Sequence, residues 1–136
     1  MVGVTVGRGA PDRAVKVVTV ALLLVACAAS HIPAQLRGYD IVVEPTDEQS
    51  RALAGAMRDY GFHVRDRVRG GSRPTAVLIH FLYSEPGTGQ PVSLHLRLAD
   101  TRSGAIVAAA AVPLDSVGSS ARARAEAAVR ALAPAP

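Results

Sequence analysis

The sequence has one cysteine, few aromatic residues and no long hydrophobic run. Its 136 residues include no tryptophan, and aromatic residues make up only 4% of the chain. One cysteine excludes a disulfide within the chain, and few rings argue against a site that stacks sugars or bases. The apolar run over residues 17–29 is shorter than the roughly 20 residues that a membrane-spanning helix needs. The short chain, rich in alanine and valine, instead indicates one small domain in which a large ligand pocket is unfavourable.

The N-terminus has the layout of a secretory signal. Three basic residues, Arg8, Arg13 and Lys16, precede the apolar run VVTVALLLVA, and small residues follow it. A charged region, a short apolar region and small residues, in this order, are typical of a segment that is removed after export. We therefore expect residues 1–26 to be a signal peptide.

The end of this run, Leu24-Val25-Ala26-Cys27, resembles the lipobox of bacterial lipoproteins. The resemblance implies that Cys27 carries diacylglycerol, becomes the first residue of the mature protein and anchors it to a lipid bilayer. Ala28 follows the cysteine, where family members that stay at the inner membrane often carry aspartate. The resemblance thus favours the outer membrane, facing the periplasm, over the inner membrane. The alternative is a cysteine buried in a hydrophobic helix.

The rest of the chain divides into a tether and one domain. Residues 27–37 contain a proline and show neither helical nor alternating periodicity, so we expect a short tether. Residues 38–133 are expected to form a single α+β domain. Its predicted elements are a strand at 39–45, a helix at 46–61, strands at 62–68, 75–84, 92–99 and 105–112, and a helix at 119–132.

This order, βαββββα, predicts a two-layer sandwich: a mostly antiparallel sheet of four to five strands with two helices on one face. Thr46 and Gln49 have the spacing of a capping box at the start of the first helix. Pairing Tyr83 with Val92 places Ile79 opposite Leu96 and gives a continuous apolar face for the helices to cover.

The opposite face of this predicted sheet is more apolar than a solvated face needs to be. Its alanines and leucines can be read as scattered apolar atoms in water. The alternative is a contact surface for another protein or for a second copy of the chain. The residues of this possible partner face are Leu78, Leu82, His95, Arg97, Val107 and Ala109.

The sequence contains only weak signals of metal binding, catalysis or cofactor binding. The predicted register sets His80 opposite His95, but no third ligand accompanies this pair, so we expect no metal site. No serine lies in a G-x-S-x-G elbow, and the glycine-rich GRGAPD lacks the third glycine of a dinucleotide fingerprint. We therefore expect no catalytic residues, no cofactor and no enzymatic activity.

Arginines gather between residues 65 and 73. Arg65, Arg67, Arg69 and Arg73 form a basic stripe in a chain of net charge +4. No aromatic residue is interleaved with them and the expected compartment is the envelope, so nucleic acid is not an expected partner. A solvated strand face is the simplest interpretation, and lipid phosphates or an acidic protein surface are the alternatives.

The lipobox, the βαββββα order and the strand-turn-strand LADTRSGAIVA together resemble small envelope lipoproteins of Gram-negative bacteria. In element order the domain is also similar to that of curli-secretion lipoproteins and activators of penicillin-binding proteins. Those activators cross the wall on a long linker, which this chain lacks. Of two hypotheses, we favour a non-enzymatic envelope lipoprotein that binds another envelope protein or assembly through a sheet face or edge, because few aromatic residues argue against a site that stacks sugars. The alternative is a module that binds a small molecule or cell-wall fragment between sheet and helices.

Overall fold

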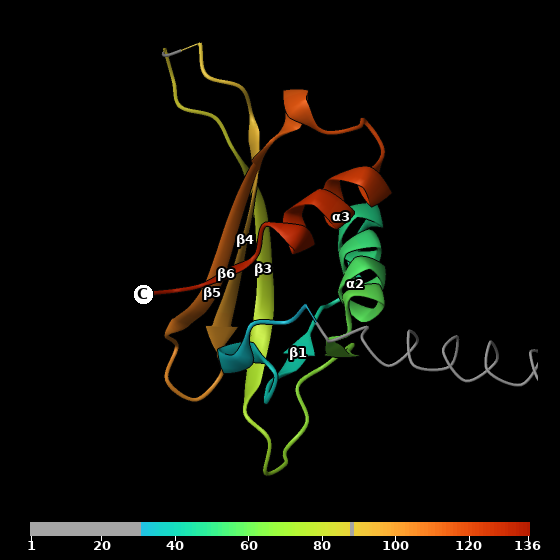
Figure 1. The fold of residues 1–136 in the computed structure, drawn as a ribbon, viewed down its shortest axis with the longest axis vertical. Coiled ribbons are helices and arrows are strands. Elements are labelled where there is room, and N and C mark those ends of the chain that lie inside the picture. Colours follow the sequence, from blue (N-terminus) through green and yellow to red (C-terminus); the bar gives the residue numbers. More distant parts are fainter. Residues whose placement is uncertain (1–30, 88) are drawn as a thin grey trace, which may run out of the picture.

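The computed structural model describes residues 31–87 and 89–136, so the predicted signal peptide and Cys27 lie outside the described residues. The fold is α+β, with a six-stranded mixed sheet and two α-helices, α2 and α3, packed on one of its faces (Figure 1). The elements are a 3₁₀ helix at Ala34–Leu36, β1 (Asp40–Val42), α2 (Glu48–Tyr60), β2 (His63–Arg65), β3 (Thr75–Tyr83), β4 (Ser93–Asp100), β5 (Ile106–Pro113), a second 3₁₀ helix at Leu114–Ser116, α3 (Ala121–Arg130) and β6 (Ala133–Pro134).

The sheet order is β2-β1-β3-β4-β5-β6. β1 pairs in parallel with β2 and with β3, while the remaining neighbours are antiparallel. The α+β class and the two helices were predicted correctly, but the sheet has six strands and is mixed. The helix between β1 and β2 returns the chain to the same end of the sheet, which makes that pair parallel. The short β6 adds one more strand after α3.

Both helices begin at polar caps. The capping box of α2 consists of Asp47 and Ser50, one residue beyond the predicted pair of Thr46 and Gln49: Asp47 Oδ1 accepts from the Ser50 amide at 2.6 Å. Gly61 ends the helix with a φ of 106°, which glycine adopts without strain. Ser120 caps α3 by accepting a hydrogen bond from the Ala123 amide at 3.1 Å.

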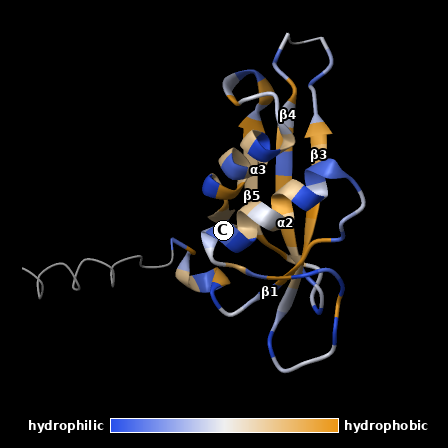
Figure 2. Cartoon of the chain, turned by 90° about the vertical axis from the view of Figure 1, so that its right-hand side faces the viewer, coloured by the Kyte–Doolittle hydropathy of each residue, from blue (hydrophilic) through white to orange (hydrophobic). Residues whose placement is uncertain are grey.

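The predicted register between β3 and β4 is wrong by one residue. Tyr83 pairs with Ser93, and Leu78 pairs with Leu98. A shift by one residue exchanges the two faces of β3, so Leu78 is buried under the helices and Ile79 is 44% exposed on the other side. β3 has apolar residues on both faces, and much of its visible ribbon is orange in Figure 2, so its pattern does not select a face.

The predicted register between β4 and β5 is shifted by two residues, which preserves the faces. Leu98 pairs with Ala108 rather than with Ile106, and at an irregularity between Leu98 and Ala99 the register shifts by one residue, so that Ala99 pairs with Ile106. Leu96, predicted to lie in the core, is completely buried. The core therefore forms between the predicted face of β4 and the two helices.

The predicted tether is also wrong in its described part. Ile32 and Leu36 belong to the hydrophobic core, and Leu36 is only 1% exposed. The 3₁₀ helix at Ala34–Leu36 turns these two apolar side chains inward, and Arg37 Nε donates to the Ile32 carbonyl at 3.0 Å. The fold thus includes Ile32 and does not begin at residue 38.

Candidate functional sites

No described element covers the face of the sheet opposite α2 and α3 (Figure 1). We call this surface the open face. By register and alternation it carries Ile79, Phe81 and Tyr83 from β3, His95 and Arg97 from β4, and Ala109 and Ala111 from β5. Ile79 and Tyr83 are among the most exposed large apolar side chains of the described residues.

Four of these side chains form a connected ladder across β3 and β4. The rings of Phe81 and His95 are stacked with centroids 5.2 Å apart, and Tyr83 meets His95 edge-on at 5.6 Å. The guanidinium carbon of Arg97 lies 5.3 Å from the centroid of Phe81. Stacked, edge-on and cation–π contacts each favour a fixed ring geometry, so the ladder presents an ordered apolar and basic surface.

The structure brings together only part of the predicted partner face. His95, Arg97 and Ala109 lie on the open face, and Val107, also from β5, is half-buried beside the core. The placement of the other two residues is wrong because of the register error. Leu78 is buried beneath the helices, and Leu82 points to the helix side near the end of β3, where it is 60% exposed.

The aromatic part of the open face was missed for the same reason. The predicted pairing of Tyr83 with Val92 also sets Phe81 on the face that the helices cover, although two large rings near the end of a strand that is apolar on both sides fit either face. That Phe81 and Tyr83 contact His95 can be inferred only when the register between β3 and β4 is known. Sequence alternation alone therefore identified a two-sided sheet but not which rings lie in the open.

The expected neighbours His80 and His95 lie on opposite faces. His80 pairs with Leu96, while His95 pairs with Phe81. His80 Nε2 lies 3.6 Å from Asp47 Oδ2, a contact that becomes an ion pair when the histidine is protonated. In the described part of the chain, no three His, Cys, Asp or Glu side chains gather as they would to hold a metal ion.

A cavity of about 220 Å³ lies beside this histidine, between the sheet and the starts of the two helices. It is lined by apolar and polar residues, namely Asp47, Gln49, His80, Phe81, Leu82, Leu94 and Arg124. Arg124 Nε is buried and has no hydrogen-bond partner among the described residues. Hydrogen bonds from Ser50 lower the pKa of Asp47, so this carboxylate stays ionised to lower pH than an ordinary aspartate.

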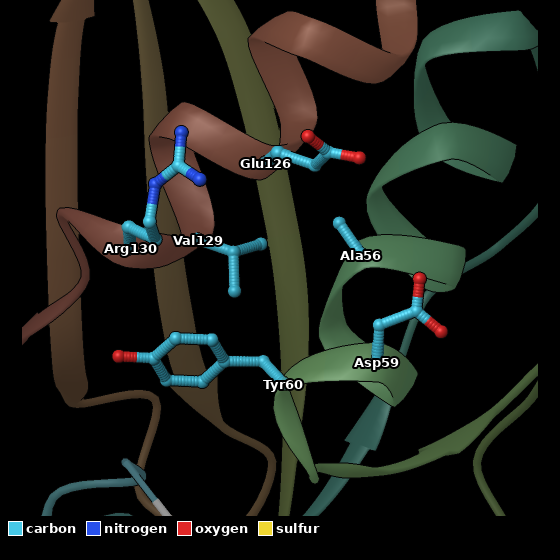
Figure 3. A pocket seen from close by; sticks show the side chains of 6 residues that line it. All are labelled: Ala56, Asp59, Tyr60, Glu126, Val129 and Arg130. Carbon is cyan, nitrogen blue, oxygen red and sulfur yellow. The ribbon is translucent and has the colours of Figure 1, made fainter.

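A second hollow, of about 200 Å³, lies where α2 and α3 meet (Figure 3). Asp59 and Tyr60 line it from α2, and Glu126, Val129 and Arg130 line it from α3. Arg122 Nε donates to Glu126 Oε1 at 2.8 Å, and this contact lowers the pKa of the glutamate. Both hollows are smaller than the roughly 300 to 1,000 Å³ of most small-molecule sites.

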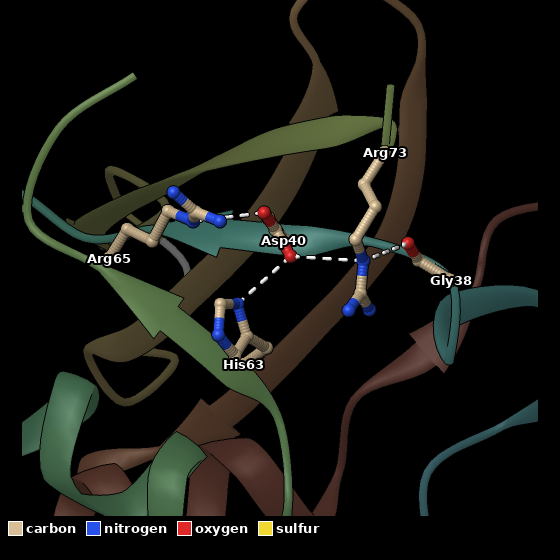
Figure 4. A network of polar contacts seen from close by, with 5 residues as sticks. All are labelled: Gly38, Asp40, His63, Arg65 and Arg73. Atoms are coloured by element: carbon tan, nitrogen blue, oxygen red, sulfur yellow. Dashed lines mark hydrogen bonds and ion pairs between the residues drawn. The ribbon is translucent and has the colours of Figure 1, made fainter. Parts of the chain in front are cut away.

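A third site is a cluster of charges around Asp40 (Figure 4). Asp40 in β1 contacts His63 and Arg65 of β2 and Arg73, which precedes β3. The parallel register of β1 with both neighbours brings these residues together from three segments. The arginines were predicted to form a stripe, but Asp40 and His63 were not expected beside them, because parallel pairing of β1 was not predicted.

Comparisons of this chain with protein-family models, with curated proteins and with solved structures find no match. The candidate functional sites are therefore the open face, the small cavities and the cluster around Asp40. Over residues 31–87 and 89–136, no helix has both the length and the apolar character needed to cross a membrane.

Proposed function

We propose that this chain is a lipid-anchored envelope protein that binds another envelope protein through the open face of its sheet and catalyses no reaction. The observation that carries the proposal is the ladder of Tyr83, His95, Phe81 and Arg97 on a face that no described element covers. Aromatic and arginine side chains are enriched at protein interfaces and among their energetically dominant residues.

The composition of the open face favours a protein partner. Ile79 lies directly opposite Arg97, so an exposed aliphatic side chain borders the ladder. On the neighbouring strand, Ala109 and Ala111 pair with Arg97 and His95. Their small side chains leave room beside the ladder, into which a partner's side chains can pack. This mixture of rings, one cation and a shallow apolar surface matches the centre of an interface better than a pocket for a small molecule.

The proposed lipid anchor would direct the Tyr83 end of the ladder away from the membrane. Ile32, the first core residue in the described part of the chain, follows Cys27 by five positions, which span at most roughly 18 Å of extended chain. A fold held so close to the bilayer has one end at the membrane. In Figure 1 the N-terminal 3₁₀ helix lies toward the end opposite the β3–β4 loop, so the Tyr83 end of the ladder is directed away from the anchor.

A charge placed on the open face tests this proposal. Ile79→Glu places a carboxylate beside the ladder, whereas Val68→Glu makes the same change at an exposed residue in the loop after β2. The measurement is the mass of the native complex in membranes solubilised with a mild detergent. We expect Ile79→Glu to reduce the complex to the free protein and Val68→Glu to leave it intact. A complex of twice the chain mass identifies the partner as a second copy, and equal complexes in all three proteins contradict the proposal.

One observation favours the alternative of a small-molecule or cell-wall-fragment binding module. The cavity lined by His80 and Arg124 lies between sheet and helices and contains a buried guanidinium nitrogen without a hydrogen-bond partner among the described residues. A soluble cell-wall fragment with a free carboxylate is the corresponding probe. Saturable shifts of the His80 ring signals, lost in Arg124→Gln, support this alternative, and unchanged signals exclude the probe as a ligand.

A further inference from the structure

An arginine-lined pocket of about 160 Å³ lies beside Asp40, where β1, β2 and the start of β3 meet. It is formed by Asp40, Arg65, Arg69, Gly70, Gly71, Ser72, Arg73 and Thr75. None of these residues belongs to the open face or to the cavity at His80. A role for the pocket is therefore separate from the partner binding proposed above.

Asp40 holds its neighbours in place and is not itself open to a ligand. Its Oδ1 lies 2.9 Å from His63 Nδ1 and 3.2 Å from Arg73 Nε, and its Oδ2 lies 2.9 Å from Arg65 Nε. The carboxylate side chain is only 7% exposed. Both arginines contact it through the inner nitrogen, and the terminal nitrogens of Arg73 are directed away from Asp40 (Figure 4). These terminal N–H groups remain as donors for a second anion.

The charges at the pocket favour such an anion. Three arginines against one carboxylate leave a net charge of +2 on the lining, and a protonated His63 behind Asp40 adds to it. Arg69 is exposed and lines the pocket without a contact to Asp40 among those described above, so its charge is not compensated there. Guanidinium groups match the oxygens of a phosphate in pairs, so a phosphate group fits this donor set.

The position of the pocket relates it to the N-terminal segment. Arg73 Nε also donates to the Gly38 carbonyl at 3.4 Å, and Gly38 follows directly on the segment that contains Ile32 and Leu36. The β2–β3 loop and this segment lie toward the same end of the molecule (Figure 1). If Cys27 carries lipid, that end faces the bilayer, where phosphate groups are concentrated.

We propose that this pocket binds the phosphate group of an anionic membrane lipid. Recognition of the phosphate rests on the pocket alone, while the choice of a lipid as its source rests on the proposed lipid anchor. Bound in this way, the lipid fixes the end of the domain that carries Asp40 against the membrane. The open face then keeps a constant orientation toward the periplasm.

The test uses the mature protein in a phosphate-free maltoside detergent, with NMR signals from the amides of Gly71 and Thr75. The probes are dihexanoyl phosphatidylglycerol and, separately, inorganic phosphate. Arg69→Gln removes one pocket cation without disturbing Asp40, and Arg67→Gln removes the same charge from an exposed residue outside the pocket. We expect phosphatidylglycerol to shift both signals, with an affinity about tenfold weaker in Arg69→Gln and within about twofold of wild type in Arg67→Gln.

Three results overturn the proposal. Absence of any shift with phosphatidylglycerol shows that the pocket takes no lipid phosphate. An equal loss of affinity in Arg67→Gln shows that net charge, and not the pocket, attracts the lipid. Shifts with inorganic phosphate alone show that the source is a free anion. None of these results alters the complex expected at the open face, so failure here is distinct from failure of the proposed function.

Discussion

Phe81 on β3 lies directly opposite His95 on β4, and their rings stack at an interplanar angle of 16°. This pair places two rings on the side of the sheet that the helices leave open. Tyr83 and Arg97 extend it in both directions along the strands. Under the proposed function, the side of β3 that carries Phe81 is therefore the side on which a partner docks.

Matched charge substitutions test which face is the core. Leu96→Asp should unfold the domain, because it buries a carboxylate without a partner at a completely buried site, at a cost of several kcal/mol. Ile79→Asp makes a comparable change on the open face and should shift the melting temperature by only a few degrees. Thermal melts followed by circular dichroism separate the two. A Leu96→Asp protein that melts like wild type would refute the described core.

The turn after β4 predicts a loss of stability in acid. Asp100 Oδ1 accepts hydrogen bonds from the amides of Ser103 and Arg102, and these bonds lower the pKa of Asp100 to about 2. Because this value lies below the roughly 3.9 of an unfolded aspartate, the contribution of Asp100 is complete above pH 4 and is lost as the pH falls toward 2.

Asp100→Asn should remove this part of the pH dependence. The variant keeps one side-chain acceptor but cannot ionise, so its stability should fall less than that of the wild type between about pH 4 and 2. Urea unfolding at a series of pH values measures the difference. Parallel curves for the two proteins across this range would show that the carboxylate has no special role in the turn.

Tyr39 predicts an effect at the other end of the pH range. Its hydroxyl donates to Asp100 Oδ2 at 3.0 Å, and this hydrogen bond raises the pKa of Tyr39 above the ordinary 10.0. The contribution of the bond to stability is present below pH 10 and is lost as the pH rises through the raised value. Absorbance titration should show one late-ionising tyrosine that disappears in Tyr39→Phe. If the late ionisation is still present in Tyr39→Phe, the assignment of the raised pKa to Tyr39 is wrong.

The proposed lipid anchor predicts a defined mature N-terminus. Wild-type protein purified from membranes should begin at Cys27 and carry the mass of attached acyl chains. Cys27→Ala should leave the chain uncleaved and without this mass. Intact-protein mass spectrometry distinguishes these species. A mature wild-type protein without acyl mass contradicts the anchor and leaves the fold unaffected.

The sequence predicted those parts of the fold that depend on local signals. The first helix ends at Gly61 as predicted, and the alternation of Leu94, Leu96 and Leu98 identified the buried face of β4, while the predicted capping pair was one residue off. These features follow from backbone conformation and from periodicity, and both can be read from a few neighbouring residues.

Pairing between distant segments could not be read in the same way. Because β3 is apolar on both faces, its sequence pattern fits two registers against β4 that differ by one residue. The two registers place opposite sets of β3 side chains on the open face. The parallel pairing of β1 gathers Asp40, His63 and Arg73 from separate segments, and no local spacing records that contact. The segment that contains Ile32 and Leu36 was similarly predicted to be a tether, because its burial depends on contacts with distant parts of the chain.

Photo-crosslinking in intact cells tests the central claim most directly. A photoreactive amino acid is placed at position 79 on the open face or, as the control, at exposed position 68 in the β2–β3 loop. We predict that position 79 yields one dominant crosslinked product with an envelope protein, or with a second copy of this chain, and that position 68 yields no such product. An absence of protein crosslinks at position 79, or the same product from both positions, would contradict binding through the open face.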